Sequence, residues 1–268
     1  MNPTTPTPDN DPLILGKHRF TSRLILGSGK SSLALIRACI DRADVEIVTL
    51  ALRRAHGAQE NILDYIPKHI TRLPNTSGAR CAEEALRIAR LSRALGCGDL
   101  IKLELIGDTR TLLPDNAETI RATRLLSEDG FSVMPYMMPD VADAHALLEA
   151  GAICLMPLAA PIGSNRGLET REQLLALRAA FSVPIIVDAG IGRPSQAAEA
   201  MELGMDAVMC NTAIATAQDI PRMAEAFALA VQAGRLAHLA GPGRILSQGG
   251  ESSSPLTDFL YEETPRHE

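Results

Sequence analysis

The sequence predicts a single α/β domain folded as a (β/α)8 barrel, the TIM-barrel fold. Strand-like runs and helical runs alternate from Ser22 onward, eight strand-like runs can be counted, and glycines follow several of the helical runs. Eight strands that are each followed by a helix favour a closed barrel, because a doubly wound sheet of this length usually has fewer strands. The 268 residues fit one such domain.

The predicted strands are short, apolar runs bounded by turn residues. They cover residues 23–29, 45–52, 70–76, 100–108, 131–136, 152–157, 183–190 and 206–211. The third run is only a possible short strand, and the count of eight depends on it.

The predicted helices have apolar residues three or four positions apart, which is the spacing of one helix face. They cover residues 32–43, 80–96, 116–130, 141–151, 170–181, 194–204 and 220–234. A glycine just past a helix accepts left-handed backbone most easily, so five glycines are predicted to mark helix ends. These are Gly96, Gly130, Gly151, Gly204 and Gly234. Residues 53–70, where the second helix should lie, are polar and interrupted, and no element is assigned there.

The domain boundaries follow from composition. Residues 1–12 are rich in Pro, Thr, Asn and Asp without a periodic pattern, so a disordered N-terminal tail is expected there. The barrel should occupy residues 13–250, and residues 251–268 should form a flexible C-terminal tail.

Composition also excludes several functions. The net charge is -6 and no basic run is interleaved with aromatic residues, which argues against nucleic-acid binding. No apolar run approaches the roughly 18 residues of a membrane helix, and the first residues lack the features of a signal peptide. We therefore expect a cytoplasmic protein that contacts no membrane.

No motif for a metal or nucleotide is found. The histidines lack HxH or HExxH spacing, and Asp140 and Asp143 are better explained as helix-capping and surface residues, so no metal site is expected. The five cysteines lack CxxC spacing and are expected to be small buried residues. The run 27–32 resembles a P-loop, but Leu24 occupies the position of its first glycine, and Lys30 is expected to be an exposed loop lysine.

Lys102 is the most unusual residue of the predicted strands. Side chains alternate between the two faces of a strand, so Lys102 and Glu104 should point into the barrel while Ile101, Leu103 and Leu105 face the helices. One interpretation is a structural ion pair that fills the barrel. The other is a partly desolvated amine that attacks a carbonyl to form an imine, with Glu104 moving protons. The residues alone leave both open, as they leave open the net direction of the Lys102 pKa shift.

Further candidates follow the later strands, where barrel enzymes place catalytic groups. Asp188 ends a buried strand and could be a second acid or base, or only a turn residue. Gly190, Gly192 and residues 210–212 follow the last two strands, where barrels often bind phosphate, and Gly163 and Ser164 could add to that site.

Ordered motifs across residues 13–241 resemble thiazole synthase of thiamin biosynthesis. They are GSGK, VTLALRR, LPNTSGAR, AEEALRIARL, IKLELIGD, LLPD, MPLAAPIGS, VPIIVDAGIG, AMELGMDAVMCNTAIA and AVQAGRLAHLAG. The resemblance implies a sulfur-transferring enzyme that builds the thiazole phosphate from 1-deoxy-D-xylulose 5-phosphate, dehydroglycine (2-iminoacetate) and sulfur. The sulfur would come from the thiocarboxylated C-terminus of the carrier protein ThiS.

The same resemblance implies roles for single residues. Lys102 matches the Schiff-base lysine, and Glu104 and Asp188 match the acid and base carboxylates. Residues matching sugar-phosphate contacts are Gly163, Ala189, Gly190, Asn211 and Thr212. The family implies no cofactor or metal, a homotetramer, and contact with a dehydroglycine-producing enzyme of the ThiH or ThiO type.

Two departures and two alternatives remain. The proline-rich start has no counterpart in the family, and an additional Gly-Pro at 241–242 affects the segment that could receive the carrier protein. A class I aldolase-like lyase would share the lysine imine and the phosphate site without a sulfur donor. A non-catalytic phosphate-binding scaffold would keep its activity without Lys102.

Overall fold

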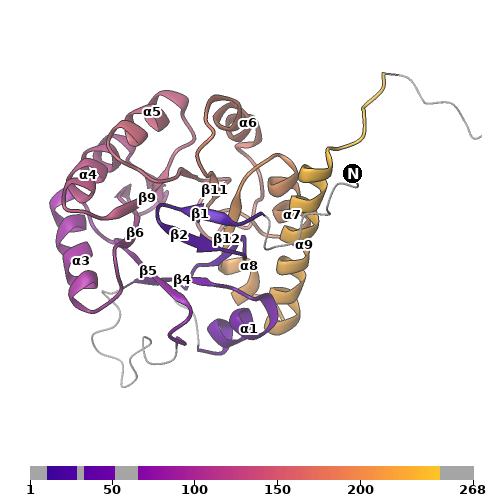
Figure 1. Ribbon diagram of the computed structural model, residues 1–268, viewed down its shortest axis with the longest axis horizontal. Helices are drawn as coiled ribbons and strands as arrows, with labels where there is room; N and C mark the ends of the chain where they lie inside the picture. Colours follow the sequence, from indigo (N-terminus) through magenta and orange to yellow (C-terminus); the bar gives the residue numbers. More distant parts are fainter. Residues whose placement is uncertain (1–10, 29–32, 52–65, 248–268) are drawn as a thin grey trace, which may run out of the picture.

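The computed structural model describes residues 11–28, 33–51 and 66–247, which form a ring of helices around a central barrel of strands (Figure 1). Eight parallel strands lie in the order β10-β9-β6-β5-β4-β3-β12-β11. Apart from β10 and β11, barrel strands that are consecutive along the chain are neighbours in the sheet, and the last strand, β12, pairs with the first, β3. The predicted (β/α)8 fold is confirmed.

The barrel strands agree with the predicted runs, although several are shorter. They are β3 (Leu24–Leu26), β4 (Ile47–Ala51), β5 (Thr71–Asn75), β6 (Leu100–Leu103), β9 (Ser132–Met137), β10 (Met156–Pro157), β11 (Ile186–Val187) and β12 (Ala207–Cys210). The doubtful third run is β5, which pairs with β4 over its whole length. Isolated bridges between Leu155 and Ile185 and between Leu158 and Asp188 close the barrel between β10 and β11.

The helices cover the outside of the barrel. They are α1 (Leu33–Ala43), α3 (Ala82–Ala94), α4 (Asn116–Glu128), α5 (Val141–Glu149), α6 (Arg171–Ala180), α7 (Pro194–Glu202), the short α8 (Thr212–Ala215) and α9 (Ile220–Ala240). Asp140 caps α5 by accepting a hydrogen bond from the Asp143 amide.

The structure confirms four of the five predicted helix-end glycines, and the prediction for Gly234 is wrong. Gly96, Gly130, Gly151 and Gly204 follow helices with φ between 78° and 100°. Gly234 lies inside α9, which continues to Ala240. A Cβ at Gly234 would lie 2.3 Å from the Ala198 carbonyl oxygen, so this glycine lets α9 approach α7 closely.

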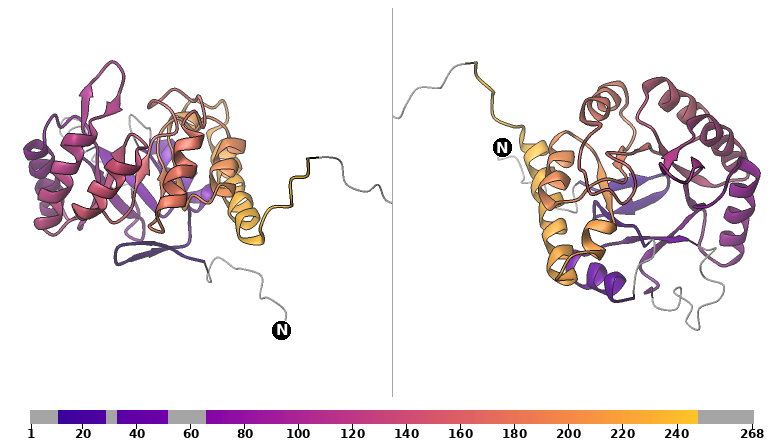
Figure 2. Two further views of the ribbon diagram at one scale, coloured as in Figure 1. Left: turned by 90° about the horizontal axis from the view of Figure 1, so that it is seen from above. Right: turned by 180° about the vertical axis from the view of Figure 1, so that it is seen from behind.

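A hairpin that was not predicted closes the amino-terminal end of the barrel. Strands β1 (Leu13–Leu15) and β2 (His18–Phe20) pair antiparallel and lie across that end (Figures 1 and 2). Leu13, Leu15 and Phe20 pack against a layer of apolar side chains inside the barrel, among them Ile25 and Met134. This half of the interior is therefore filled.

The predicted strand 100–108 is in fact two strands, so the prediction was wrong in its extent. The barrel strand β6 ends at Leu103, and β7 (Ile106–Asp108) pairs antiparallel with β8 (Leu113–Pro114). This second hairpin projects from the end of the barrel opposite to β1 and β2 (Figure 2). The chain thus leaves the barrel directly after Glu104.

Ion pairs fasten the chain at the amino-terminal end. Asp11, which was assigned to the N-terminal tail, accepts two hydrogen bonds from the Arg235 guanidinium at 2.7 and 2.8 Å. Arg23 is buried and lies 3.0 Å from an Asp11 oxygen, and Arg178 pairs with Asp206 at 2.8 Å. Asp11 is therefore attached to α9 and to the residue that directly precedes β3.

Several expectations fall outside the described residues, namely those for residues 1–10, for Lys30, for residues 52–65 and for the predicted C-terminal tail. In the part of the chain that is described, no helix is long and apolar enough to cross a membrane. Of the cysteines, Cys81 is half-buried and the other four are buried.

Candidate active site

Lys102, Glu104 and Asp188 meet inside the barrel, and we call them the lysine triad. The Lys102 ammonium nitrogen lies 3.1 Å from Glu104 Oε2 and 2.9 Å from Asp188 Oδ2. The three residues are only 2%, 6% and 6% exposed, respectively. Strand alternation turns Lys102 inward, and the break after β6 keeps Glu104 beside it. Asp188 comes from the opposite edge of the sheet order, directly after β11, so barrel closure brings it within reach.

The two carboxylates of the triad keep Lys102 protonated in spite of its burial. Burial alone would lower the pKa of Lys102, but Asp188 and Glu104 outweigh burial and leave that pKa above its ordinary value. The lysine of the free protein is therefore protonated, and its proton must move to a neighbour before the amine can react.

The two carboxylates are shifted in opposite directions. Burial would raise the pKa of Glu104, but Lys102 and hydrogen bonds from Asn75 and Ser77 leave it below the ordinary value. Burial raises the pKa of Asp188, and the Lys102 charge offsets this only in part. Pairs of acidic groups with pKa values pushed apart are typical of acid and base assignments in active sites.

The end of β5 holds Glu104 in place. Asn75 lies opposite Lys102 in the parallel register, and its Nδ2 donates to Glu104 Oε2 at 2.9 Å. Thr76 Oγ1 donates to the Glu104 carbonyl and accepts from the Glu104 amide. Both the backbone and the carboxylate of Glu104 are thus fixed by the neighbouring strand.

Tyr136 forms a wall of the lysine triad. It is fully buried on β9, with its ring centroid 5.0 Å from Lys102 Nζ, a distance suited to a cation–π contact. Its hydroxyl makes a long, 3.5 Å hydrogen bond to the Leu112 carbonyl between β7 and β8. Burial is the main reason that the Tyr136 pKa lies above its ordinary value.

A cavity of about 1080 Å³ opens at the carboxyl ends of the strands and contains the lysine triad. The five predicted sugar-phosphate residues, Gly163, Ala189, Gly190, Asn211 and Thr212, all line it. We call these five the cradle. The structure therefore places Lys102, Glu104, Asp188 and the cradle around one cavity. Ser164, which was a weaker candidate, does not line this cavity.

The cradle depends on close backbone packing. Gly190 has φ of +85°, and a Cβ there would lie 2.4 Å from the Ala160 amide nitrogen. Its carbonyl accepts a hydrogen bond from the Gly167 amide at 2.8 Å. Ala189 also has positive φ, 64°, which costs energy for a residue with a Cβ and often marks a functional site.

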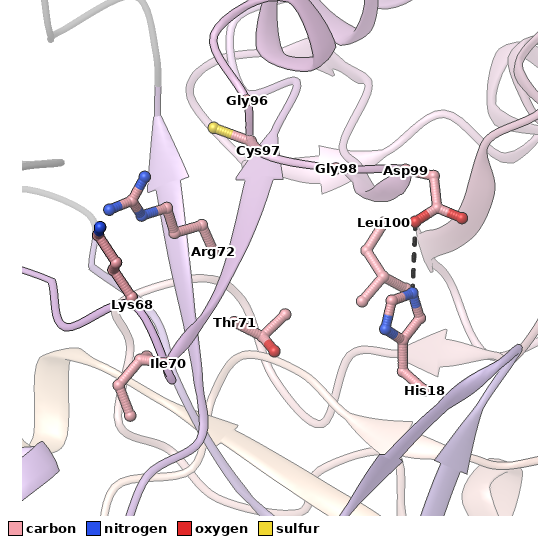
Figure 3. Close-up of a pocket in the computed structure, with 10 residues that line it drawn as sticks. All are labelled: His18, Lys68, Ile70, Thr71, Arg72, Gly96, Cys97, Gly98, Asp99 and Leu100. Atoms are coloured by element: carbon pink, nitrogen blue, oxygen red, sulfur yellow. Dashed lines mark hydrogen bonds and ion pairs between the residues drawn. The ribbon is translucent and has the colours of Figure 1, made fainter.

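A second cavity, of about 410 Å³, lies at the amino ends of β5 and β6 (Figure 3). Lys68 and Arg72 stand on one side of it, and His18 contacts Asp99 at 3.3 Å on the other. This cavity shares no lining residue with the larger one, so its residues lie apart from the lysine triad.

The sequence interpretation missed Asn75, Tyr136 and Gly27. Gly27 lines the larger cavity, and its amide donates to the Cys210 carbonyl at 2.9 Å. Strand alternation from Met134 could have predicted the inward side chain of Tyr136. Within the described residues, no group of three or more His, Cys, Asp or Glu side chains could hold a metal ion.

The comparisons with known proteins agree on one family. The model of the family "Thiazole biosynthesis protein ThiG" matches residues 14–255. A thiazole synthase from Clostridium beijerinckii is 61% identical and one from Fusobacterium nucleatum is 63% identical, each over 251 residues. Each alignment covers 93% of this chain and 98% of the relative.

Solved structures agree as well. The Amycolatopsis orientalis BexX/CysO complex contains a chain that is 33% identical, with a TM-score of 0.80. The alignment covers 88% of this chain and 98% of that chain. A "Native KDPGal structure", at 20% identity and a TM-score of 0.57, shows only that the fold is shared.

Proposed function

This chain belongs to the family of thiazole biosynthesis protein ThiG and is an enzyme of the thiazole synthase class, and from that premise we propose that Lys102 forms an imine with the sugar phosphate. The observation that carries this proposal is the lysine triad, with two carboxylate oxygens within 3.1 Å of the amine. The substrate would be 1-deoxy-D-xylulose 5-phosphate.

Imine formation begins with a proton transfer. The ammonium of Lys102 gives one proton to a carboxylate of the triad, and the neutral amine attacks the ketone carbon. A carbinolamine forms, takes up a proton on its oxygen and loses water, which leaves a C=N bond to Lys102 Nζ. Burial of the triad supports this step, because transfer of the proton to a carboxylate neutralises both groups and burial disfavours charged forms.

A carboxylate of the triad has a second role once the imine has formed. A protonated imine withdraws electrons and acidifies the neighbouring carbon, so that Glu104 or Asp188 can remove a proton there. Return of the proton at another atom shifts the carbonyl to the position that sulfur attacks. Dehydroglycine (2-iminoacetate) then supplies the remaining ring atoms, and loss of water closes the thiazole.

The cradle would hold the phosphate of the substrate. It contains no charged side chain, so the anion would be held by the amides of Gly163, Ala189 and Gly190 and by the polar groups of Asn211 and Thr212. Positive φ at all three supports this role, because turns of this kind at the carboxyl ends of barrel strands can direct backbone amides toward an anion.

The enzyme acts on substrates of the thiamin pathway together with a sulfur-carrier partner. In the Amycolatopsis orientalis complex BexX is paired with CysO, which fits a partner of this kind. We propose that the partner here is the thiocarboxylated carrier ThiS. Contact with a dehydroglycine-producing enzyme and assembly as a homotetramer are further proposals, to be tested by copurification and by analytical ultracentrifugation.

Reductive trapping tests the proposed imine. The protein is incubated with 1-deoxy-D-xylulose 5-phosphate, reduced with borohydride and weighed by intact-protein mass spectrometry. We expect one adduct on the wild type and none on Lys102→Ala. No adduct on a folded wild type, or an equal adduct on Lys102→Ala, would contradict the imine.

Product analysis tests the reaction itself. Wild-type protein with the sugar phosphate, dehydroglycine and carrier thiocarboxylate should yield the thiazole phosphate. Lys102→Arg serves as the matched variant, because it keeps a buried positive charge but cannot form the imine. A product of carbon–carbon cleavage in place of the thiazole would indicate an aldolase-like lyase.

A further inference from the structure

The two carboxylates of the lysine triad lie at nearly equal distances from Lys102 but have different partners. Glu104 Oε2 accepts hydrogen bonds from both Lys102 Nζ, at 3.1 Å, and Asn75 Nδ2, at 2.9 Å. Asp188 Oδ2 lies 2.9 Å from Lys102 Nζ, is fully buried, and has no hydrogen bond of good geometry. Among the described residues, Glu104 Oε2 thus has a neutral side-chain donor in addition to Lys102, and Asp188 Oδ2 has none.

Asn75 is held in the orientation that this contact needs. Its Oδ1 accepts a hydrogen bond from the Ser77 amide at 2.8 Å, so its nitrogen is the atom that faces Glu104. Asn75 also ends β5 opposite Lys102, where the sheet register fixes its backbone. An amide has no charge to give up, so this donor stays in place whatever the protonation of its neighbours.

We propose that Asn75 is a positioning residue that keeps Glu104 ionised, so that the proton of Lys102 passes to Asp188 during imine formation. One proton moves from Nζ to Asp188 Oδ2, the Nζ lone pair becomes free to bond the ketone carbon, and no electrons are exchanged with another reagent. A hydrogen bond to the ionised form of a carboxyl lowers its proton affinity, which is the physical basis of the selection. The inference rests on the Lys102 imine proposed above.

Other ionisable groups face the same space. Lys102 comes from β6, Tyr136 from β9 and Asp188 from the end of β11, while the largely exposed Arg80 lines the cavity mouth. The buried Cys210 of β12 interacts electrostatically with Asp188. Lys102 is shared by both carboxylates, so it does not by itself distinguish them. Of the two carboxylates, Asn75 donates a hydrogen bond only to Glu104.

The direct test is a titration of the two carboxyls by ¹³C nuclear magnetic resonance in protein labelled at the Asp and Glu side chains. The signals are assigned with Glu104→Gln and Asp188→Asn. We expect Asp188 to titrate at higher pH than Glu104 in the wild type. Asn75→Leu should raise the Glu104 midpoint by about one pH unit or more, because a hydrogen bond to a charged group is lost. If the Glu104 midpoint stays unchanged, the proposal is wrong.

A kinetic cycle tests whether Asn75 acts through Glu104. The rate of cyanoborohydride trapping with the sugar phosphate is measured against pH in the wild type, Asn75→Leu, Glu104→Gln and the double variant. Asn75→Leu should move the acid limb to higher pH in the wild-type background and leave it unmoved in Glu104→Gln. An equal movement in both backgrounds would mean that Asn75 contacts the substrate itself, which overturns the proposal.

Asn116→Leu is the matched control. Asn116 Nδ2 donates to the Asp143 carboxylate at 2.6 Å, the same kind of contact, but neither residue lines the cavity. This variant should leave the acid limb unchanged. If Asn75→Leu does not fold by circular dichroism, Asn75→Ala takes its place. Absence of any adduct on the wild type would instead reject the imine, whereas the carboxyl titration tests Asn75 independently of it.

Discussion

The two ends of the barrel interior differ in what fills them. At the amino-terminal end, each strand contributes an apolar side chain, and Leu15 and Phe20 of the β1–β2 hairpin pack on this layer. At the carboxyl end, the same strands contribute Asn75, Lys102, Asp188 and the cradle, around a cavity of about 1080 Å³. One set of strands therefore supplies stability at one end and chemistry at the other, so substitutions at the two ends should have separable effects.

Lys102→Ala should have the largest effect. Loss of the amine that forms the imine should reduce thiazole formation by on the order of 10³-fold or more. The variant also leaves Glu104 and Asp188 buried without their shared cation, which should cost about 3 to 5 kcal/mol of unfolding free energy at neutral pH. Product assays and urea unfolding measure the two effects. Activity close to that of the wild type would show that the reaction does not need the Lys102 amine at the carboxyl end.

Asp188→Asn should have the next largest effect, a loss of about 10²- to 10⁴-fold in imine trapping, because the proton acceptor is removed. Asp206→Asn is the matched control at the opposite end. Asp206 directly precedes β12 and pairs with Arg178, whereas Asp188 directly follows β11. A trapping rate that falls equally in both variants would show that the two ends are not separable.

Leu15→Ala tests the filled end. Leu15 is fully buried, and its truncation should cost about 2 to 5 kcal/mol of unfolding free energy through lost packing and a cavity. The trapping rate per folded molecule should not change. Ile14→Ala on the same hairpin, where Ile14 is 44% exposed, should cost less than about 0.5 kcal/mol. A change in the trapping rate of the folded fraction would show that the hairpin affects the active site.

Glu104→Gln should show a pH-dependent loss of stability. The folded-state pKa of Glu104 lies below its ordinary value because of Lys102 and Asn75, although burial opposes the shift. Its charge therefore stabilises the fold at pH values above the ordinary pKa of a glutamate. This contribution is lost as the pH falls through the folded-state pKa. Wild type should exceed the variant by about 1 to 3 kcal/mol at neutral pH, with the difference shrinking in acid. Urea unfolding at several pH values would show a constant difference if Glu104 were not involved.

Asp11→Asn should have the smallest effect, about 1 kcal/mol of unfolding free energy, because Asp11 is partly exposed and solvent weakens its ion pairs. Thermal melts at low and at high salt measure this loss, which salt should reduce. The trapping rate should stay at the wild-type value. A larger loss that salt does not change would point to buried hydrogen bonds as the source.

Much of the site could be predicted from the sequence because its residues sit on regular strands. Alternation along β6 turned Lys102 inward, and the end of the next-to-last strand singled out Asp188. The contact between them could not be predicted, because it depends on closure of the barrel across the β10–β11 seam. Asn75 was missed because the run around β5 contains polar residues and gives only a weak periodic pattern.

The errors in the fold have local causes. The pattern of residues 100–108 continues through Leu105 and Ile106, so it cannot reveal that β7 pairs with β8 instead of extending β6. Strands β1 and β2 have three residues each, too few to show a period. In the sequence, Gly234 resembles a helix-end glycine. Only the structure shows that α7 packs against it and leaves no space for a Cβ.

The β1–β2 hairpin also has a consequence for access to the lysine triad. The hairpin and the apolar layer fill the amino-terminal half of the interior, whereas the cavity beside Lys102 lies at the carboxyl ends of the strands. Among the described residues, the open side of the triad is therefore the carboxyl end. Under the proposed reaction, the sugar phosphate and the sulfur donor would have to approach Lys102 from that same side.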